Sequence, residues 1–290
     1  MRLAARYWSL LLLAGLAAFG PARAAGAEPT DRGVPWPSPP DPRERVVFDA
    51  KSKWHRILVV DQGDQRSLYF GDTDGDTQST ISLRDPRAVP MEYIRHAASA
   101  LAFGGPRRSA LIVGLGGGTY PMLLRRSFPT MSIDVVELDP QVRQVARDHF
   151  GLVEDAQLRV HIADGAAFLR RTRQRWDLIF LDAYGAGGIP DALATDAFFA
   201  TVARRLAPYG LAIANITDTN SGRERAIIGR FAKPFRACVL QHTPTSDNVI
   251  VVAARALPRD LTAALQALDR EGRLPFPVAP MAPRYRPCAE

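Results

Sequence analysis

Four positions in the sequence place ligand-binding or proton-transferring residue types directly after apolar runs. They are the glycine-rich segment 114–119, Glu137, Asp164 and Asp182. The apolar runs that precede them are typical of buried β-strands. Because ligands of open α/β sheets bind at the carboxyl ends of the strands, we expect these residues to share one site.

The glycine-rich segment distinguishes between two classes of nucleotide ligand. Its sequence, Gly-Leu-Gly-Gly-Gly-Thr, lets the backbone approach a ligand closely and adopt positive φ. The dinucleotide fingerprint G-x-G-x-x-G would need glycine where Thr119 stands. Gly114, Gly116 and Gly118 instead form G-x-G-x-G, which favours an S-adenosyl nucleoside, a ligand without a pyrophosphate. A purely structural tight turn is the alternative.

Two carboxylates are placed to hold the nucleoside. Glu137 ends the run "VVE", and a carboxylate there can accept two hydrogen bonds from ribose hydroxyls, in NAD and S-adenosyl ligands alike. Asp164, followed by Gly165, can accept from an adenine amino group and can cap the next helix at the same time. Asp139, just before Pro140, is better explained as a helix N-cap than as a ligand contact.

The fourth position is the candidate for catalysis. Asp182 follows the apolar run "LIFL", at the expected end of a strand. A carboxylate there can orient or deprotonate an amine nucleophile. A helix cap or a loop salt bridge is the alternative for Asp182. Tyr184, two residues further on, is the second catalytic candidate.

The composition argues against nucleic-acid and metal chemistry. The chain has 290 residues and a net charge of +7, but only three of its 37 basic residues are lysines and the arginines are scattered. This charge reflects an arginine-rich composition rather than nucleic-acid binding. The densest run, "RRTRQR" at 170–175, is better explained as a solvent-exposed helix end than as a phosphate site. The five histidines fall in no metal-ligand spacing, so we expect no metal.

The N-terminus has the pattern of a secretory signal peptide. Arg2 and Arg6 precede an apolar core at 8–19, and "ARA" at 22–24 fits the small-x-small cleavage rule. The core is too short for a membrane span, which needs about 20 apolar residues. We therefore expect residues 1–24 to be removed and the chain to be exported to the periplasm, with no stable membrane span after processing. An uncleaved N-terminal anchor is the alternative.

Strand and helix patterns alternate from residue 109 onward. Strands are predicted at 110–114, 132–138, 158–163, 176–182, 210–216, 236–241 and 248–254, and helices at 118–127, 140–149, 164–172, 195–206, 221–231 and 258–270. Continuous apolar strands separated by helices predict an α/β fold with a doubly wound, mostly parallel, seven-stranded sheet. The last two strands are too close for a crossover helix, so we expect an antiparallel hairpin at one edge. This is the layout of class I S-adenosylmethionine-dependent methyltransferases.

The same patterns divide the chain into five segments. They are a signal peptide at 1–24, a Pro-rich linker at 25–52, a β-hairpin region at 53–90, a Rossmann-like transferase domain at 91–272 and an irregular tail at 273–290. Two apolar runs around the turn "DQGDQ" predict the hairpin. Cys238 and Cys288 could pair in an oxidising compartment, although the sequence does not establish the bond.

Together these motifs resemble the spermidine synthase (polyamine aminopropyltransferase) family, in its divergent spermidine synthase-like branch. The resemblance covers roughly residues 55–255 and rests on "LIVGLGGG", "VVELDP", "IADGAAFL", "WDLIFLDAY" and "LATDAFFATVARRLAPYGLAIANI". It implies that Glu137 holds the ribose, that Asp164 holds the adenine and that Asp182 is the catalytic aspartate. Gln78 resembles the family's Gln near the nucleoside and the aminopropyl group. The resemblance also implies S-adenosylmethionine or its decarboxylated form as co-substrate, a small amine or other small acceptor, and a homodimer or tetramer.

The acceptor half of the family pattern is altered. Gly117 stands where the family has Asp, "YIR" at 93–95 replaces Tyr-His-Glu, and "DAYGA" at 182–186 replaces Asp-Ser-Ser-Asp-Pro. The missing acids are those that would bind a diamine such as putrescine, and each charge-assisted hydrogen bond is worth roughly 1.5–3 kcal/mol. Arg95, in place of an acid, adds repulsion. We therefore expect the nucleoside-binding part of the site to be intact and the polyamine-binding part to be degraded.

Three functions are consistent with the sequence. The first is alkyl transfer from a sulfonium, with aminopropyl transfer ahead of methyl transfer because of the family resemblance. The second is an exported, catalytically silent nucleoside-binding or scaffold protein, which the signal peptide motivates. The third, an NAD-dependent oxidoreductase, is disfavoured because Thr119 breaks the dinucleotide fingerprint.

Overall fold

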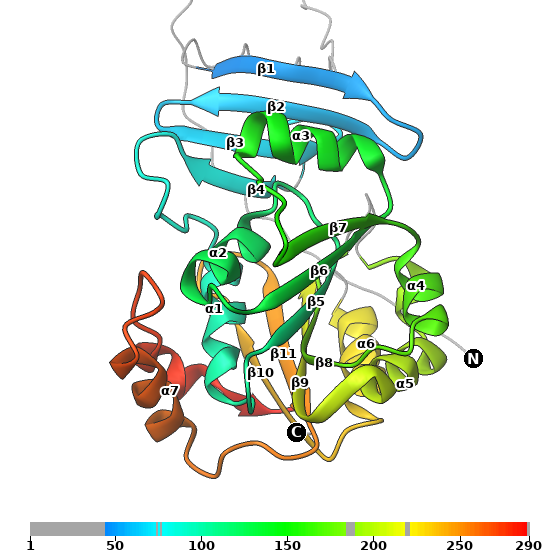
Figure 1. Ribbon diagram of the computed structural model, residues 1–290, viewed down its shortest axis with the longest axis vertical. Helices are drawn as coiled ribbons and strands as arrows, with labels where there is room; N and C mark the ends of the chain where they lie inside the picture. Colours follow the sequence, from blue (N-terminus) through cyan, green and yellow to red (C-terminus); the bar gives the residue numbers. More distant parts are fainter. Residues whose placement is uncertain (1–43, 74, 76, 184–188, 218–220, 289–290) are drawn as a thin grey trace, which may run out of the picture. The chain divides into compact units, whose positions relative to one another are not determined.

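Residues 44–82 fold into an antiparallel sheet of four strands in the order β1-β2-β3-β4, as the computed structural model shows (Figure 1). The structure describes residues 44–73, 75, 77–183, 189–217 and 221–288. The strands are β1 (Glu44–Lys51), β2 (Arg56–Gln62), β3 (Gln65–Phe70) and β4 (Thr77–Ser82). The hairpin predicted around "DQGDQ" is confirmed as β2–β3, with Gly63 in the turn at φ 61°.

The predicted linker ends too late in the sequence. Its last residues form β1, which pairs with β2 from Glu44 opposite Gln62 to Lys51 opposite Arg56. The sequence pattern did not indicate this strand, because charged residues stand at both of its ends. Such residues are tolerated there because the strand lies at the sheet edge and only part of its surface is buried.

The second sheet has eight strands in the order β12-β10-β11-β9-β8-β5-β6-β7. The strands are β5 (Ser109–Val113), β6 (Ser132–Glu137), β7 (Leu158–Ile162), β8 (Trp176–Leu181), β9 (Leu206–Thr217), β10 (Ala237–His242), β11 (Asn248–Ala254) and β12 (Arg286–Pro287). The five strands from β7 to β9 are parallel, and β10 and β11 form the expected antiparallel hairpin. The mostly parallel α/β sheet is therefore confirmed.

Helices cover both faces of this sheet (Figure 1). One core includes residues of α1 (Glu92–Ser99), α2 (Thr119–Ser127), α3 (Pro140–Phe150) and α7 (Leu261–Arg270). The other includes residues of α4 (Gly165–Arg171), α5 (Asp196–Arg205) and α6 (Ser221–Ala232). Two separate apolar clusters on opposite faces define the doubly wound arrangement.

Local sequence signals set the helix boundaries. Asp139 caps α3 by accepting a 2.8 Å hydrogen bond from the backbone N–H of Gln141, as predicted, and Pro140 occupies the first helical position. Gly151 ends α3 with φ 74°. Thr195 and Asp260 cap α5 and α7 in the same way.

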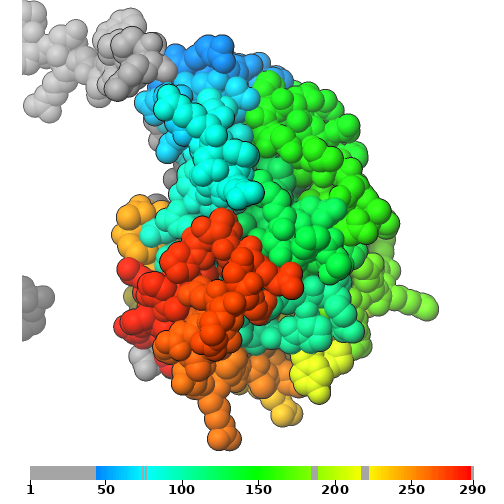
Figure 2. Space-filling view, turned by 60° about the vertical axis from the view of Figure 1, so that its left-hand side comes forward, coloured from blue at the N-terminus to red at the C-terminus, as the bar shows by residue number. Residues whose placement is uncertain are grey.

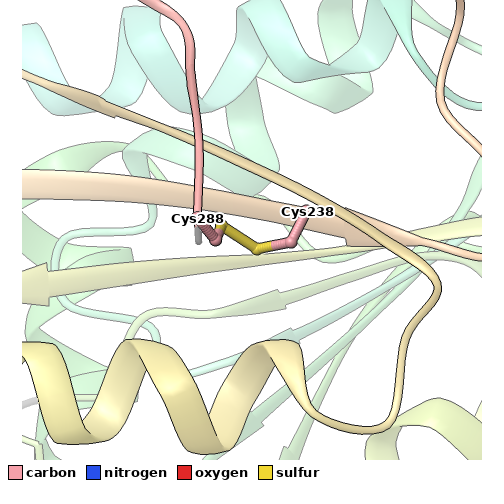
Figure 3. Close-up of a disulfide and its surroundings, with 2 residues drawn as sticks. All are labelled: Cys238 and Cys288. Carbon is pink, nitrogen blue, oxygen red and sulfur yellow. A yellow bond between two sulfur atoms is a disulfide. The ribbon is translucent and has the colours of Figure 1, made fainter. Parts of the chain in front are cut away.

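The predicted seven strands become eight because the tail is not irregular throughout. The tail contains a short 3-10 helix, η3 (Ala279–Arg284), and β12, which pairs with β10. Cys238 on β10 and Cys288 just after β12 form a disulfide, with their Cα atoms 5.4 Å apart (Figure 3). A two-residue strand in a Pro-rich segment has no periodic pattern, so the sequence carries no signal for it.

The C-terminal segment, red in Figure 2, is visible at the surface, where η3 packs against α7. The hydroxyl groups of Tyr285 and Ser99 are 2.7 Å apart and both residues are buried. The ring of Tyr285 also packs edge-on against Phe103. These contacts make the tail part of the core beneath α1.

Parts of three predictions lie outside the described residues: the signal peptide at 1–24, the linker up to residue 43, and Tyr184. Among the helices that the structure describes, none is both long and apolar enough to cross a membrane.

Candidate active site

The site lies where the strand order reverses, between β5 and β8. β5 and β8 are parallel neighbours, with β6 beside β5 on one side and β9 beside β8 on the other. Such a reversal in strand order opens a crevice at the carboxyl ends of the two strands. Gly114 follows β5 and Asp182 follows β8. A Cβ on Gly114 would lie 2.1 Å from the carbonyl oxygen of Asp182, and its φ is 100°. Gly114 therefore lets the glycine turn pass directly beside Asp182.

Asp182 is held by two side chains from other elements. The hydroxyl of Tyr93 on α1 donates to Oδ2 at 3.2 Å, and Nδ2 of Asn215 on β9 donates to Oδ1 at 2.9 Å. Asn215 is itself fixed by Asn248, whose Nδ2 donates to Asn215 Oδ1 at 2.9 Å. Burial raises the pKa of Asp182 to about 6, although the bonds from Asn215 and Tyr93 lower it. Asp182 thus has a fixed orientation and a pKa suited to accepting a proton near neutral pH.

A buried tyrosine lies in the field of the same carboxylate. Tyr120, in the first turn of α2, is 2% exposed, and its ring packs against Phe180 with centroids 4.6 Å apart. Its hydroxyl has no hydrogen-bond partner among the described residues. Burial and the charge of Asp182 both raise the pKa of Tyr120.

Glu137 connects the glycine turn to the end of β6. Its Oε2 accepts from the backbone N–H of Leu115 at 3.0 Å, and its Oε1 accepts from that of Asp139 at 2.8 Å. Burial raises the pKa of Glu137 to about 7, against the lowering effect of these backbone hydrogen bonds. A carboxylate offers about four acceptor positions, so both oxygens keep capacity for a ligand hydroxyl.

Asp164 lies at the end of the neighbouring strand. It is exposed, and its Oδ1 caps α4 by accepting from the N–H of Ala167 at 2.7 Å. The N-cap role is therefore confirmed, and the adenine contact stays a prediction. Gly165 packs closely on β5, where an added Cβ would lie 2.6 Å from Val113 Cγ1.

Two apolar side chains are exposed between these carboxylates. Leu138 follows Glu137 and is 44% exposed, and Ile162, at the end of β7, is 41% exposed. Glu137 and Ile162 are register partners, so both apolar groups belong to the same edge of the sheet. They provide an apolar surface next to Glu137 and Asp164, the residues predicted to hold the ribose and the adenine.

The small N-terminal sheet reaches the glycine turn through β4. Ser79 accepts a 2.8 Å hydrogen bond from the backbone N–H of Gly117, and Gln78 is its neighbour on the strand. A Cβ on Gly117 would lie 2.8 Å from Phe150 Cδ1 and 2.9 Å from Ser79 Cβ. The space that the family's aspartate side chain would enter is therefore occupied here by Ser79 and Phe150.

Charged groups on α1 are engaged by other partners. Nη1 of Arg95 donates to the carbonyl oxygens of Val89 at 2.6 Å and Pro90 at 3.1 Å. Oε2 of Glu92 accepts from the N–H and the hydroxyl of Thr245 at 2.9 and 2.6 Å. Burial opposes ionisation of Glu92, but these two bonds and the nearby charges of His96 and Arg95 leave its pKa below the usual range.

The glycine turn, Glu137, Asp164 and Asp182 all lie at the carboxyl edge of the second sheet. Gln78 lies on β4, the strand whose Ser79 contacts the glycine turn. Sequence reasoning missed Asn215 and Tyr120 as neighbours of Asp182, and Asn248 as the partner of Asn215. Asn215 carried a usable signal, since it lies near the carboxyl end of a predicted strand. The rest depend on pairing and packing that no local pattern encodes.

The metal-ligand residue types do not cluster in the described ranges: no group of three or more His, Cys, Asp or Glu is placed to hold an ion there.

Comparison with known proteins identifies the fold and then the family. Human methyltransferase-like protein 13, solved in complex with SAH, is 26% identical, with a TM-score of 0.59 over 64% of this chain and 94% of that one. A probable spermidine synthase from Corynebacterium glutamicum gives a TM-score of 0.65 at 22% identity, over 77% of this chain and 86% of that one. The fold is therefore that shared by S-adenosylmethionine-dependent methyltransferases and spermidine synthases.

The sequence comparisons are more specific. Residues 86–227 match the Spermine/spermidine synthase domain. The polyamine aminopropyltransferase of Chromobacterium violaceum is 30% identical over 219 residues, which are 75% of this chain and 83% of the relative. That of Vibrio vulnificus is also 30% identical, over 64% of this chain and 66% of the relative. The chain belongs to the spermidine synthase family.

Proposed function

We propose that this protein transfers an aminopropyl group from decarboxylated S-adenosylmethionine to a small amine acceptor. The observation that carries the proposal is Asp182, fixed by Tyr93 and Asn215 directly beside the glycine turn at the reversal in strand order. The relatives named polyamine aminopropyltransferase support the choice of reaction.

The residues of the nucleoside half support this co-substrate. Glu137 keeps acceptor capacity for ribose hydroxyls, and Asp164 is exposed at the next strand end for the adenine amino group. Leu138 and Ile162 offer an apolar surface for the adenine ring. The carboxyl edge of the sheet thus supplies polar groups for orientation and apolar groups for contact, as nucleoside sites commonly do.

The proposed chemistry is an in-line displacement at the carbon attached to the sulfonium. The amine nitrogen forms a bond to that carbon, the carbon–sulfur bond breaks, and its electron pair neutralises the sulfur to a thioether. Asp182 orients the amine and accepts the proton that the nitrogen loses. A pKa near 6 leaves Asp182 ionised, and therefore able to accept, above that pH.

The acceptor is proposed to carry less positive charge than a diamine. Ser79 and Phe150 fill the space beside Gly117, and Glu92 is occupied by Thr245. Arg95 also adds a positive charge to the helix that carries Tyr93. A doubly charged amine would find fewer carboxylates here than the family pattern provides.

Methyl transfer from S-adenosylmethionine is the second candidate. It is supported by the similarity to human methyltransferase-like protein 13 in complex with SAH, and by 28% identity to the human eEF1A lysine and N-terminal methyltransferase over 57% of this chain. The same Asp182 could orient a methyl acceptor, since both reactions displace a thioether from a sulfonium.

Export to the periplasm is part of the proposal. The pattern of residues 1–24 motivates it. The Cys238–Cys288 disulfide supports it, because such bonds persist mainly in oxidising compartments.

Product analysis distinguishes these reactions. The purified chain is incubated with each co-substrate and a panel of mono-, di- and polyamines, and the nucleoside product is identified by mass spectrometry. Methylthioadenosine from the decarboxylated co-substrate supports aminopropyl transfer, and S-adenosylhomocysteine supports methyl transfer. Calorimetry with both co-substrates and methylthioadenosine is the control: binding without turnover favours the silent nucleoside-binding protein, and no binding below about 1 mM rejects the proposal.

A further inference from the structure

A second concave site lies at the end of the sheet opposite to Asp182. Its volume is about 820 Å³, and four arginines are among the residues that line it: Arg175, Arg204, Arg236 and Arg255. We propose that this cavity binds a small organic anion that carries a di- or triphosphate group. The proposal does not depend on the reaction proposed for Asp182.

The sheet register explains why these arginines meet. Arg175 comes just before β8, Arg236 just before β10, and Arg255 just after the antiparallel β11. Ala237 pairs with Ala254, so Arg236 and Arg255 flank one pair at the sheet end.

The remaining arginine comes from a helix that ends at the same edge. Arg204 is in the last turn of α5, immediately before β9, whose first residue Leu206 pairs with Trp176. Asp182 follows the other end of β8, a separation of roughly 20 Å along a strand. The cavity is therefore distinct from the candidate active site.

The four guanidinium groups lack countercharges. Of the described residues that line the cavity, none is an Asp or Glu, and no ion pair within the described ranges involves these four arginines. Arg204 has one neutral partner, the hydroxyl of Thr201 at 2.7 Å.

Several other arginines among the described residues have an acidic partner. Arg143 with Glu154, Arg107 with Glu271 and Arg66 with Asp61 all form ion pairs. Four positive charges without an acidic partner around one concavity create a positive potential. Each planar guanidinium group can also donate two parallel hydrogen bonds to two oxygens of one phosphate group.

The rest of the lining is apolar and suits an organic group. Leu206, Pro208 and Phe235 contribute apolar walls, and two alanines on α5 leave space beside them. The volume lies within the range of about 300–1,000 Å³ typical of small-molecule sites. The concavity is open to solvent, and its four arginines are exposed. Its bounded volume and apolar wall favour a small anion over a nucleic-acid strand, which needs an extended basic surface.

Calorimetry with pyrophosphate and ATP as probes tests the proposal on the disulfide-bonded protein. We expect both to bind below about 1 mM in low salt, with AMP weaker than ATP because it carries fewer phosphates. The double variant Arg175→Gln/Arg236→Gln is expected to weaken pyrophosphate binding about tenfold or more. The matched control Arg87→Gln/Arg147→Gln removes the same charge from two exposed residues outside the cavity, and we expect a change within about twofold.

Several outcomes would overturn the proposal: no binding of either probe, an equal loss in the control variant, or tighter binding of a single-stranded oligonucleotide than of ATP at equal salt. Displacement of pyrophosphate by saturating methylthioadenosine would also overturn it, because the anion would then occupy the nucleoside site.

If the double variant does not fold, phenylglyoxal labelling of the unaltered protein replaces it. Pyrophosphate is then expected to protect Arg175 and Arg236 from modification, and equal labelling with and without pyrophosphate would reject the cavity as its site.

Discussion

Two opposing influences determine the pKa of Asp182. Burial favours the protonated acid, whereas hydrogen bonds from Asn215 and Tyr93 favour the carboxylate, and the resulting pKa is about 6. Asn248 extends the network by fixing Asn215. The carboxylate is thus oriented by side chains that themselves have little freedom to move.

The substitution Asp182→Asn tests this role through the pH profile. A base must be ionised, so kcat is expected to fall about tenfold per pH unit below pH 6 and to level off above it. Asp182→Asn should lower kcat about 10²–10⁴-fold and abolish this limb of the profile. Its methylthioadenosine affinity is the control and should stay unchanged; equal turnover in both proteins would exclude Asp182 as the base.

Gly117→Asp tests whether the lost acid can simply be restored. The new Cβ would lie within 3 Å of Phe150 and Ser79, so the variant is expected to lose about 1–3 kcal/mol of unfolding free energy. We also expect no gain in diamine binding, because the surrounding groups block the side chain. Urea unfolding measures the loss of stability, and calorimetry with putrescine measures diamine binding. A stable variant that binds putrescine more tightly would show that Ser79 and Phe150 do not block the side chain.

The C-terminal segment depends on a covalent link rather than on a long strand. β12 has only two residues, yet the disulfide from Cys288 to Cys238 fixes the segment to β10 (Figure 3). Further in, Tyr285 packs beneath α1, the helix that carries Tyr93. The tail therefore belongs to the packing that supports the candidate site.

Removing the disulfide should weaken folding measurably. Cys238→Ser/Cys288→Ser releases a loop closed over 50 residues, and the expected loss is about 2–4 kcal/mol, because the unfolded chain gains freedom. Thermal unfolding with and without a reductant provides the comparison. The reductant should lower the Tm of the unaltered protein and leave the variant unaffected; equal Tm values in all four conditions would show that the bond does not contribute.

The chain as a whole combines a fold usually associated with S-adenosyl nucleosides and a signal-peptide pattern at its N-terminus. Fractionation with N-terminal sequencing tests the export that this pattern predicts. We expect a periplasmic product that begins at Ala25 and carries an oxidised Cys238–Cys288 pair. A product that retains Met1 in the cytosol with free thiols would reject export.

Most of the succession of strands and helices, with the exception of β1 and β12, was predictable because it depends on local sequence patterns. Apolar runs of strand length, the caps at Asp139 and Asp164, and the short link between β10 and β11 carry that information locally. The positions of Glu137 and Asp182 followed as well, since a residue just after a parallel strand must lie at the carboxyl edge.

Only the tertiary structure decided which side chains surround Asp182 and why the turn has glycine at 117. Tyr93 and Asn215 reach Asp182 from α1 and β9, and Ser79 reaches Gly117 from the other sheet. These contacts join residues 33 to 89 positions apart, and their geometry follows from strand register and helix packing. The sequence alone determined most of the elements and the candidate nucleoside-binding edge; long-range packing, which local patterns do not encode, determined the partners of the catalytic candidate.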